Sequence, residues 1–236
     1  MGNVHDKLTR AAARCGVTRF LFLSPIKVLG EATGRGEVCT ESFPTTDGDD
    51  VYARSRVDAE TALRDIAELT GMEVVIVHPP LVYGLGVGGN FGALDCLVER
   101  GWPLPLAGIH NRRSLIGREN LADFLARCVT HPAAAHETFV ISDGEKPSTP
   151  ELVHPIAAVR CRATRLFNVP LRLLTAAASA LEKGASARWL IKTLQVGSTK
   201  ARERLGWLPP ISVDDQLRRT VRRRDELTTE RQAAGR

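Results

Sequence analysis

The sequence predicts an α/β fold built on a parallel sheet and followed by a mostly helical C-terminal lobe. Two short apolar runs, Arg19–Leu23 and Glu73–Val77, have the composition of buried strands and stand on either side of a long helical stretch, Val51–Thr70. A third buried strand, Thr138–Ile141, comes later, and helical patterns dominate after it. Strands that alternate with helices are typical of a parallel sheet covered by crossover helices.

The first elements have clear ends. Val4–Cys15 carries apolar residues at helical spacing, and Gly16 is a suitable stop for that helix. The helix Val51–Thr70 is closed by Gly71 in the same way. Between them, the connection Gly30–Asp50 is long for a compact domain, so we consider it a candidate functional loop.

The second half continues the pattern. A helix is expected over Asn90–Arg100, and the run Ser114–Gly117 predicts a short strand that leads into another helix. Ser148–Glu151 has the form of a helix start, with an N-cap serine, a proline in the first turn and a glutamate at the capping-box position. Further helices are expected at Val169–Lys183, at Ser198–Leu205, and from Val213 to the arginine cluster Arg222–Arg224.

The composition fits a globular chain with one main domain and a small second lobe. The chain has 236 residues, 43% of them hydrophobic, and a formal net charge of +5. Basic residues gather at Arg218–Arg224, but Asp214 and Asp215 belong to the same expected helix. A solvated helix end is therefore favoured over a nucleic-acid patch, and no nucleic-acid partner is expected.

Cysteine use and hydropathy predict a cytoplasmic location. The five cysteines are odd in number and widely separated, with no Cys-x-x-Cys pair, which argues against a disulfide framework or a zinc site. The most apolar tract, Leu171–Leu181, is too short to cross a bilayer, and Met1–Lys7 lacks the apolar core of a signal peptide. We expect no membrane partner and no bound metal.

A tyrosine and an arginine share one face of the helix Val51–Thr70. Tyr52 and Arg56 are four residues apart, so their side chains project to the same side near the helix start. A cation beside a phenol favours its ionised form, which suits a tyrosine that takes or gives a proton. An exposed helix pair would look the same in the sequence, so the surrounding motifs must decide between the two interpretations.

These surrounding motifs resemble a known family. The segments Phe20–Gly30, Val51–Glu60 and Val74–Gly84 are similar to the core of the extended short-chain dehydrogenase/reductases, in their nucleotide-sugar epimerase and dehydratase branch. The similarity continues in order through Gly88–Phe91, Arg112–Leu115, Asn120–Asp123, Ser142–Glu145, Ser148–Leu152 and Lys200–Pro210. It implies an incomplete Rossmann-like parallel sheet over residues 1–160, without the first strands and glycine motif, and a helical lobe on the substrate side over residues 161–236.

The resemblance implies catalytic and cofactor roles for specific residues. Tyr52 matches the tyrosine that moves the hydroxyl proton, and Arg56 stands where the family has a lysine that holds the ribose of NAD or NADP. Arginine keeps the charge but is not deprotonated in practice, so a proton relay through Arg56 is lost. The usual Ser or Thr position falls on Pro25, which has no hydroxyl, and leaves Ser24 as the candidate to polarise the substrate oxygen. Pro79 matches the residue that faces the nicotinamide.

Substrate-binding roles are implied in the same way. Arg113 matches the arginine that pairs with the diphosphate of the nucleotide, and Arg112 takes this role if the register slips by one. Asn90 is expected to touch the sugar nucleotide, and Lys27 to approach a sugar or a phosphate. The motifs around Lys27 and Arg113 are most similar to 4-epimerases and reductases that act on UDP-N-acetylhexosamines.

No glycine-rich turn of the kind that holds a cofactor pyrophosphate precedes the strand Arg19–Leu23. The formal Gly-x-Gly-x-x-Gly match at Gly84–Gly89 is not expected to fill this role. Residues 79–83 separate it from the preceding strand, and no second strand with an acidic end follows at the usual distance.

Two functions are therefore expected. The first is an NAD-dependent nucleotide-sugar epimerase, dehydratase or reductase that acts on a UDP-sugar. The second is a truncated, non-catalytic relative that binds a sugar nucleotide or a partner, which the changes at Pro25 and Arg56 and the missing glycine turn favour. A sheet of three strands around Phe20, Val74 and Phe139 would leave one edge open, so a homo-oligomer or a completing chain is an expected partner.

Overall fold

The main sheet has three parallel strands. The computed structural model describes residues 4–45, 50–87, 89–180 and 189–222. The strands are β1 (Arg19–Leu23), β2 (Glu73–His78) and β5 (Thr138–Val140), paired in the order β1-β2-β5. These are the three strands that the sequence predicts, with ends that differ by one residue.

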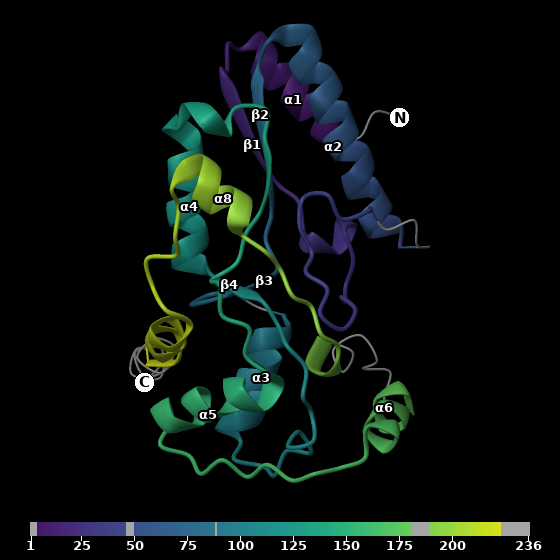
Figure 1. Cartoon of the computed structure of the whole chain (residues 1–236), viewed down its shortest axis with the longest axis vertical. Coiled ribbons are helices and arrows are strands. Elements are labelled where there is room, and N and C mark those ends of the chain that lie inside the picture. Colours follow the sequence, from purple (N-terminus) through teal and green to yellow (C-terminus); the bar gives the residue numbers. More distant parts are fainter. Residues whose placement is uncertain (1–3, 46–49, 88, 181–188, 223–236) are drawn as a thin grey trace, which may run out of the picture.

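Two pairs of helices cover the two faces of this sheet (Figure 1). The first pair is α1 (Val4–Arg14) and α2 (Val51–Thr70), and the second is α4 (Arg118–Thr130) and α8 (Thr199–Leu205). Each face has its own hydrophobic core. The core under α1 and α2 contains Phe22, Ala59, Leu63, Ile66 and Ile76. The core under α4 and α8 contains Val75, Val77, Phe124, Phe139 and Trp207.

A second half of the molecule lies beyond the carboxyl ends of the main strands (Figure 1). Its sheet has two parallel strands, β3 (Leu81–Tyr83) and β4 (Leu115–Gly117). Its helices are α3 (Asn90–Glu99), α5 (Thr149–Val159) and α6 (Leu171–Ala180), and residues 213–222 are also helical. A third core, which includes Tyr83, Phe91, Leu115, Ile156 and Leu217, draws on sequence from both sides of residue 160.

Helix ends follow local sequence rules. The Asp50 carboxylate accepts hydrogen bonds from the backbone N–H groups of Tyr52 and Ala53, so it caps the start of α2. At the other end, Gly71 has a φ of 72°, the left-handed conformation that glycine tolerates best. α5 begins with the predicted capping box between Ser148 and Glu151.

The structure corrects one interpretation of the sequence. β3 was not predicted, because two prolines precede it and proline is unusual next to a strand. The strand ends directly before Gly84, so residues 79–83 are not merely a separating segment: three of them form a strand that leads straight into the glycine loop Gly84–Gly89. Because β3 pairs only with β4, this loop still does not follow a strand of the main sheet.

Some predicted features lie outside the described residues: the acidic turn at 47–49, the last residues of the helix ending at Lys183, and Arg223 with Arg224. All five cysteines are free. None of the helices described is both long enough and apolar enough to span a membrane.

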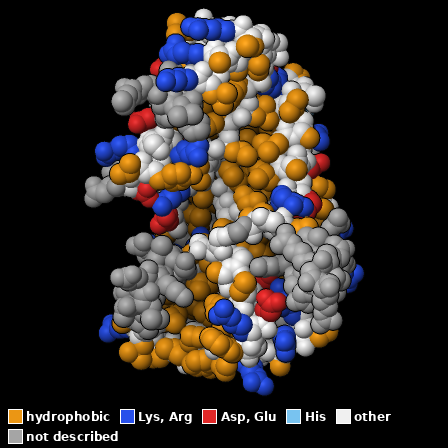
Figure 2. Space-filling view, turned by 180° about the vertical axis from the view of Figure 1, so that it is seen from behind, with side chains coloured by type: hydrophobic (Ala, Val, Ile, Leu, Met, Phe, Trp, Pro, Cys, Tyr) orange, Lys and Arg blue, Asp and Glu red, His pale blue; other side chains and the backbone are white. Residues whose placement is uncertain are grey.

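β1 is an end strand of the main sheet, as the sequence predicts. Near it, the exposed fraction is 39% for Val17, 43% for Leu23 and 55% for Val129. Seen from behind, the upper half of the molecule carries a band of hydrophobic side chains (Figure 2). Open strand edges and apolar bands of this kind are typical of surfaces that another polypeptide covers.

Candidate functional site

The carboxyl ends of β1 and β2 meet at one place, where an open parallel sheet normally binds its ligand. Ser24 follows β1, and His78 ends β2. The backbone N–H of Ser24 donates to the carbonyl oxygen of Val77 at 2.9 Å, and that of Ile26 donates to Pro79 at 3.1 Å. The two strand ends are therefore fixed against each other.

The start of α2 brings Tyr52 and Arg56 together beside β1. The guanidinium carbon of Arg56 lies 5.2 Å from the ring centre of Tyr52 and 5.7 Å from that of Phe22. Phe22 is buried in β1, whereas the Tyr52 side chain is 49% exposed. The pair therefore faces accessible space, with the cation held between the phenol and the strand.

Lys27 connects the end of β1 to the start of α2. Its ammonium lies 2.5 Å from the Asp50 carboxylate and 3.1 Å from that of Glu31. These carboxylates, Asp50 foremost, raise the pKa of Lys27, and Lys27 in turn lowers the pKa of Asp50. The predicted ligand-binding lysine is thus already engaged by two acidic groups, which makes it first of all a tether for the helix that carries Tyr52.

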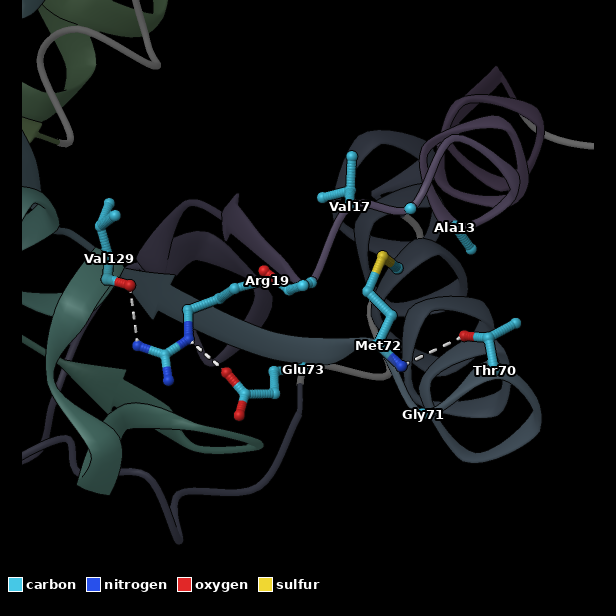
Figure 3. A pocket seen from close by; sticks show the side chains of 10 residues that line it. Ala13, Val17, Arg19, Thr70, Gly71, Met72, Glu73 and Val129 are labelled. Atoms are coloured by element: carbon cyan, nitrogen blue, oxygen red, sulfur yellow. Dashed lines mark hydrogen bonds and ion pairs between the residues drawn. The ribbon is translucent and has the colours of Figure 1, made fainter.

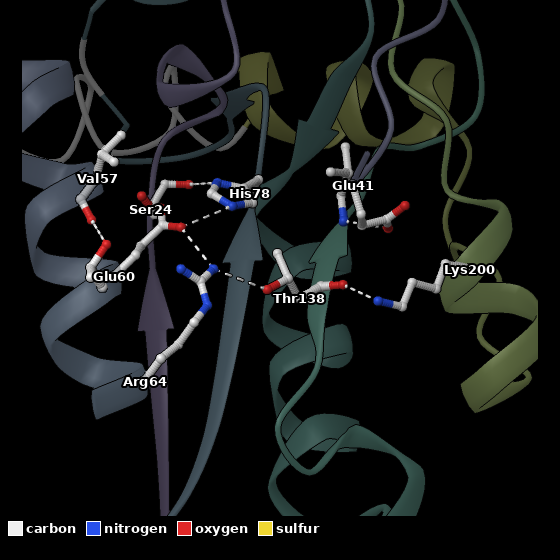
Figure 4. A network of polar contacts seen from close by, with 10 residues as sticks. Ser24, Glu41, Val57, Glu60, Arg64, His78, Thr138 and Lys200 are labelled. Atoms are coloured by element: carbon white, nitrogen blue, oxygen red, sulfur yellow. Dashed lines mark hydrogen bonds and ion pairs between the residues drawn. The ribbon is translucent and has the colours of Figure 1, made fainter. Parts of the chain in front are cut away.

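A buried polar network lies under the strand tips (Figure 4). The ring nitrogen Nδ1 of His78 is 3.2 Å from the carbonyl oxygen of Ser24, and this oxygen can only accept, so Nδ1 carries the proton. Nε2 of His78 lies 3.6 Å from the carboxylate of Glu60, which also pairs with Arg64 at 3.2 Å. Burial lowers the pKa of His78, against the opposing influence of Glu60. The network anchors the middle of α2 to the ends of β1 and β2.

Ser24 is part of this buried layer. Its side chain is completely buried, and its Oγ has no hydrogen-bond partner. The structure therefore brings two of the three predicted catalytic residues into contact and leaves the third beneath the surface.

Glu60 was missed by the sequence interpretation. It lies four residues after Arg56, so it continues the helix face of Tyr52 and Arg56 down into the core. Its exposed fraction is only 5%, and Oε1 has no hydrogen-bond partner. The helical spacing alone was a signal that could have found it.

Arg113 is the most unusual cation of the site. Its exposed fraction is 4%, and none of the ion pairs found in residues 4–222 as described includes it. One terminal nitrogen donates to the carbonyl oxygen of Lys192 at 2.9 Å, but Nε has no acceptor. Burial lowers the pKa of Arg113 to about 10, against the opposing charge of Glu31, so the side chain stays charged at neutral pH. Arg112 instead is exposed and pairs with Glu151 at 3.2 Å.

The other two predicted ligand residues, Pro79 and Asn90, differ in exposure. Pro79 is buried at the end of β2, next to the network of His78. Asn90 is partly exposed at the first turn of α3, after Gly89. Their predicted roles remain predictions.

A cleft also lies elsewhere. It has a volume of about 540 Å³ and is lined at the amino ends of the main strands by Arg19 and Glu73 (Figure 3). Arg19 bonds to Glu73 at 2.6 Å and donates to the carbonyl oxygen of Cys128 at 2.7 Å, at the end of α4. Its side chain is thus used for packing, and the cleft is at the wrong end of the strands for the proposed chemistry. No cluster of potential metal ligands occurs among the residues described.

Comparison with known proteins identifies the family to which this chain is similar. Residues 3–142 match the model of the NAD dependent epimerase/dehydratase family. The UDP-glucose 4-epimerase of Vibrio cholerae is 38% identical over 218 residues, which span 91% of this chain and 65% of that protein. An uncharacterised protein of Sinorhizobium fredii is 27% identical over 91% of this chain and likewise 65% of its own length.

Solved structures show the same fold. The UDP-glucose 4-epimerase of Thermotoga maritima, determined with UDP-glucose, has a TM-score of 0.72 at 18% identity, over 94% of this chain and 68% of that one. The UDP-glucuronic acid 4-epimerase of Bacillus cereus, determined with NAD, has a TM-score of 0.73 at 15% identity, over 95% and 67%. With its parallel sheet and the family match over residues 3–142, this chain belongs to the NAD-dependent epimerase/dehydratase family.

Proposed function

We propose that this chain binds a UDP-sugar, with the diphosphate at Arg113 and the sugar ring between the strand tips and the start of α2. The observation that carries the proposal is the Arg113 guanidinium, which is buried and charged and has an Nε without an acceptor. Burying a cation without an acidic partner is costly, and an anionic ligand removes this cost. Within the family, relatives are named as UDP-sugar 4-epimerases, which supports this class of ligand.

The proposed reaction site is the Tyr52 and Arg56 pair. Tyr52 takes or gives the proton of a sugar hydroxyl, and the Arg56 cation, 5.2 Å from its ring centre, stabilises negative charge on the phenol. NAD or NADP, when bound, supplies hydride transfer at the sugar carbon. Ser24 polarises the sugar oxygen in this scheme, provided that the oxygen reaches its buried Oγ. Asn90 and Lys27 are the remaining proposed sugar-nucleotide contacts, and residues 161–236 form the proposed substrate-side lobe.

The described residues suit one end of the cofactor better than the other. Tyr52 and Arg56 are in contact at the start of α2, and Pro79 directly follows β2; these are the residues proposed to hold the nicotinamide and its ribose. In residues 4–222 as described, no glycine-rich turn follows β1, β2 or β5, so these residues offer no backbone cradle for a pyrophosphate. Sugar-nucleotide binding is therefore the part of the function that these residues support on their own. The alternative function is a non-catalytic relative that keeps only this binding.

Replacing Arg113 by glutamine tests the binding site. The variant keeps a polar side chain but shortens it and loses the charge, so UDP affinity is expected to fall by about 1.5–3 kcal/mol, or roughly ten- to a hundredfold. Isothermal titration with UDP measures this. Arg112→Gln is the matched control: it changes the exposed neighbour, and binding is expected to stay as in the wild type.

Two results of this experiment would contradict the proposal in different ways. If the wild-type chain does not bind UDP, the proposed function is wrong. If Arg112→Gln weakens binding and Arg113→Gln does not, the diphosphate site belongs to the neighbouring arginine. Titration with NADH then separates the two functions, because saturable micromolar binding favours the enzyme and its absence favours the non-catalytic relative.

We also propose that a completing polypeptide covers the open edge of β1. The relatives are longer than the matched part of this chain, and Leu23 beside the edge is 43% exposed. Without such a partner, the isolated chain is expected to self-associate as its concentration rises, and Leu23→Lys to suppress this, because an edge lysine blocks strand pairing. Sedimentation velocity measures the effect. If the wild-type chain and the Leu23→Lys variant are both monomers of 25.7 kDa at every concentration, the proposal is contradicted.

A further inference from the structure

Trp189 carries a second buried hydrogen-bond donor beside Arg113. The exposed fraction of its side chain is 8%, and its indole nitrogen Nε1 is buried without a hydrogen-bond partner. A buried indole N–H normally finds an acceptor, because leaving it without one costs as much as a lost hydrogen bond. The orphan donor therefore needs an explanation.

The two orphan donors belong to one packing unit. The guanidinium carbon of Arg113 lies 5.4 Å from the ring centre of Trp189, a cation–π contact. Nε of Arg113 and Nε1 of Trp189 are both buried, and neither has an acceptor in the described structure. Two unpartnered donors on residues that are in contact, one of them charged, are the kind of groups that an anionic oxygen satisfies.

The backbone around both residues is held firmly. Asn111 donates to the carbonyl oxygen of Leu190 at 3.0 Å, and Thr149 donates to the same oxygen at 2.6 Å. Further along, the backbone N–H of Ser114 donates to Leu194 at 2.8 Å. The segment after Trp189 is thus bonded along the segment that carries Arg113. Because both side chains stand on fixed backbone, their relative position is set before any ligand arrives.

Another buried group without partners shows the difference. In the side-chain amide of Gln216, both the oxygen and the nitrogen lack a hydrogen-bond partner, so the unpartnered atoms are an acceptor and a donor. A group that offers both a donor and an acceptor, and carries no charge itself, does not indicate an anion. The pair of Arg113 and Trp189 offers donors and a positive charge.

We propose that Trp189 is a specificity-determining residue whose indole N–H donates to an oxygen of the anion that Arg113 binds. This rests on the proposed function, because the anion is the diphosphate of the sugar nucleotide. The neutral donor adds a directed hydrogen bond to the charge attraction of Arg113. Its role is therefore to select an anion with an oxygen at one fixed position, rather than any negative charge.

The test uses Trp189→Phe, which keeps an aromatic ring under Arg113, removes the N–H and makes the ring smaller. The affinity for UDP, measured by isothermal titration on the full chain, is expected to fall about tenfold. Trp207→Phe is the matched control, since it removes an indole N–H that already bonds to Asp123 at 2.8 Å, in the core under α4 and α8. Its UDP affinity is expected to equal that of the wild type.

A second measurement needs no folded variant of Trp189. The chain has three tryptophans, so a nitrogen–proton correlation spectrum of the wild type shows three indole signals. Spectra of Trp102→Phe and Trp207→Phe assign the other two. Addition of UDP is expected to move the indole proton of Trp189 downfield, as a hydrogen bond to a charged oxygen does, and to leave the signals of Trp102 and Trp207 in place.

The outcomes separate this inference from the proposed function. If the wild type binds UDP but Trp189→Phe binds equally well, or the Trp189 signal does not move, the inference is overturned and the function stands. If the wild type does not bind UDP at all, both are overturned. A tenfold loss together with a downfield shift supports the inference.

Discussion

Arg160→Met is expected to destabilise the chain by about 3–5 kcal/mol, because it takes a guanidinium away from a buried carboxylate. Arg160 makes two hydrogen bonds to Asp95, of 2.8 and 3.0 Å, and joins α5 to α3. The exposed fraction of the Asp95 side chain is 1%. Urea unfolding measures the loss.

The same substitution at the surface provides the control. Arg218 and Asp214 are also 2.8 Å apart, but their side chains are 61% and 52% exposed. Arg218→Met is expected to change the free energy of unfolding by no more than about 0.5 kcal/mol. If Arg160→Met and Arg218→Met lower the free energy of unfolding equally, burial of the ion pair does not determine its contribution to stability.

A double variant sharpens the argument. Replacing both partners, as in Asp95→Leu with Arg160→Met, removes the uncompensated charge and fills the space with apolar atoms. Much of the stability lost in Arg160→Met is then expected to return. Asp95→Leu alone is expected to cost less than Arg160→Met, because Arg160 keeps Glu99 at 3.3 Å. If the double variant is as unstable as the sum of the two single ones, the residues do not act as a pair.

Asp143→Leu is expected to cost about 3 kcal/mol or more. The carboxylate of Asp143 accepts three hydrogen bonds: from the hydroxyl of Tyr83 at 2.8 Å, from the backbone of Gly117 at 2.9 Å and from Asn120 at 2.7 Å. These donors come from β3, from the end of β4 and from α4, so the residue joins the small sheet to the main one. Burial raises the pKa of Asp143 and that of Tyr83, which shows how closed this junction is to water.

Tyr83→Phe serves as the control for this junction. It removes one donor and leaves the carboxylate with the other two, so it is expected to cost about 1 kcal/mol. Urea unfolding of both variants at constant pH measures the difference. If Asp143→Leu costs no more than Tyr83→Phe, the carboxylate does not act as the shared acceptor.

Much of the fold was predictable from periodicity and helix ends. The strands β1, β2 and β5 are mostly apolar runs, α2 begins and ends with capping residues, and α5 begins with a capping box, so local sequence marks them directly. β3 was not predictable, because its three residues follow two prolines and its partner β4 lies more than thirty residues later in the chain. A strand so short is defined by its pairing and not by its own sequence.

The functional site was likewise predictable only in part. Helical spacing predicted that Tyr52 and Arg56 share a face, and the structure confirms the contact. It could not predict that Asp50 and Glu31 engage Lys27, because Glu31 and Asp50 come from the long connection whose path no local pattern fixes. Trp189 belongs to no motif, and only its burial beside Arg113 distinguishes it from the other two tryptophans.

The topology of the main sheet also governs how the chain folds. Arg19 of β1 bonds to Glu73 of β2, 54 residues later, and β5 joins only after another long excursion. Closing such loops costs entropy before any pairing is gained, which slows folding far more than it lowers final stability. During synthesis, β1 leaves the ribosome well before β2, and so it waits as an unpaired apolar segment that a chaperone or a neighbouring nascent chain can capture.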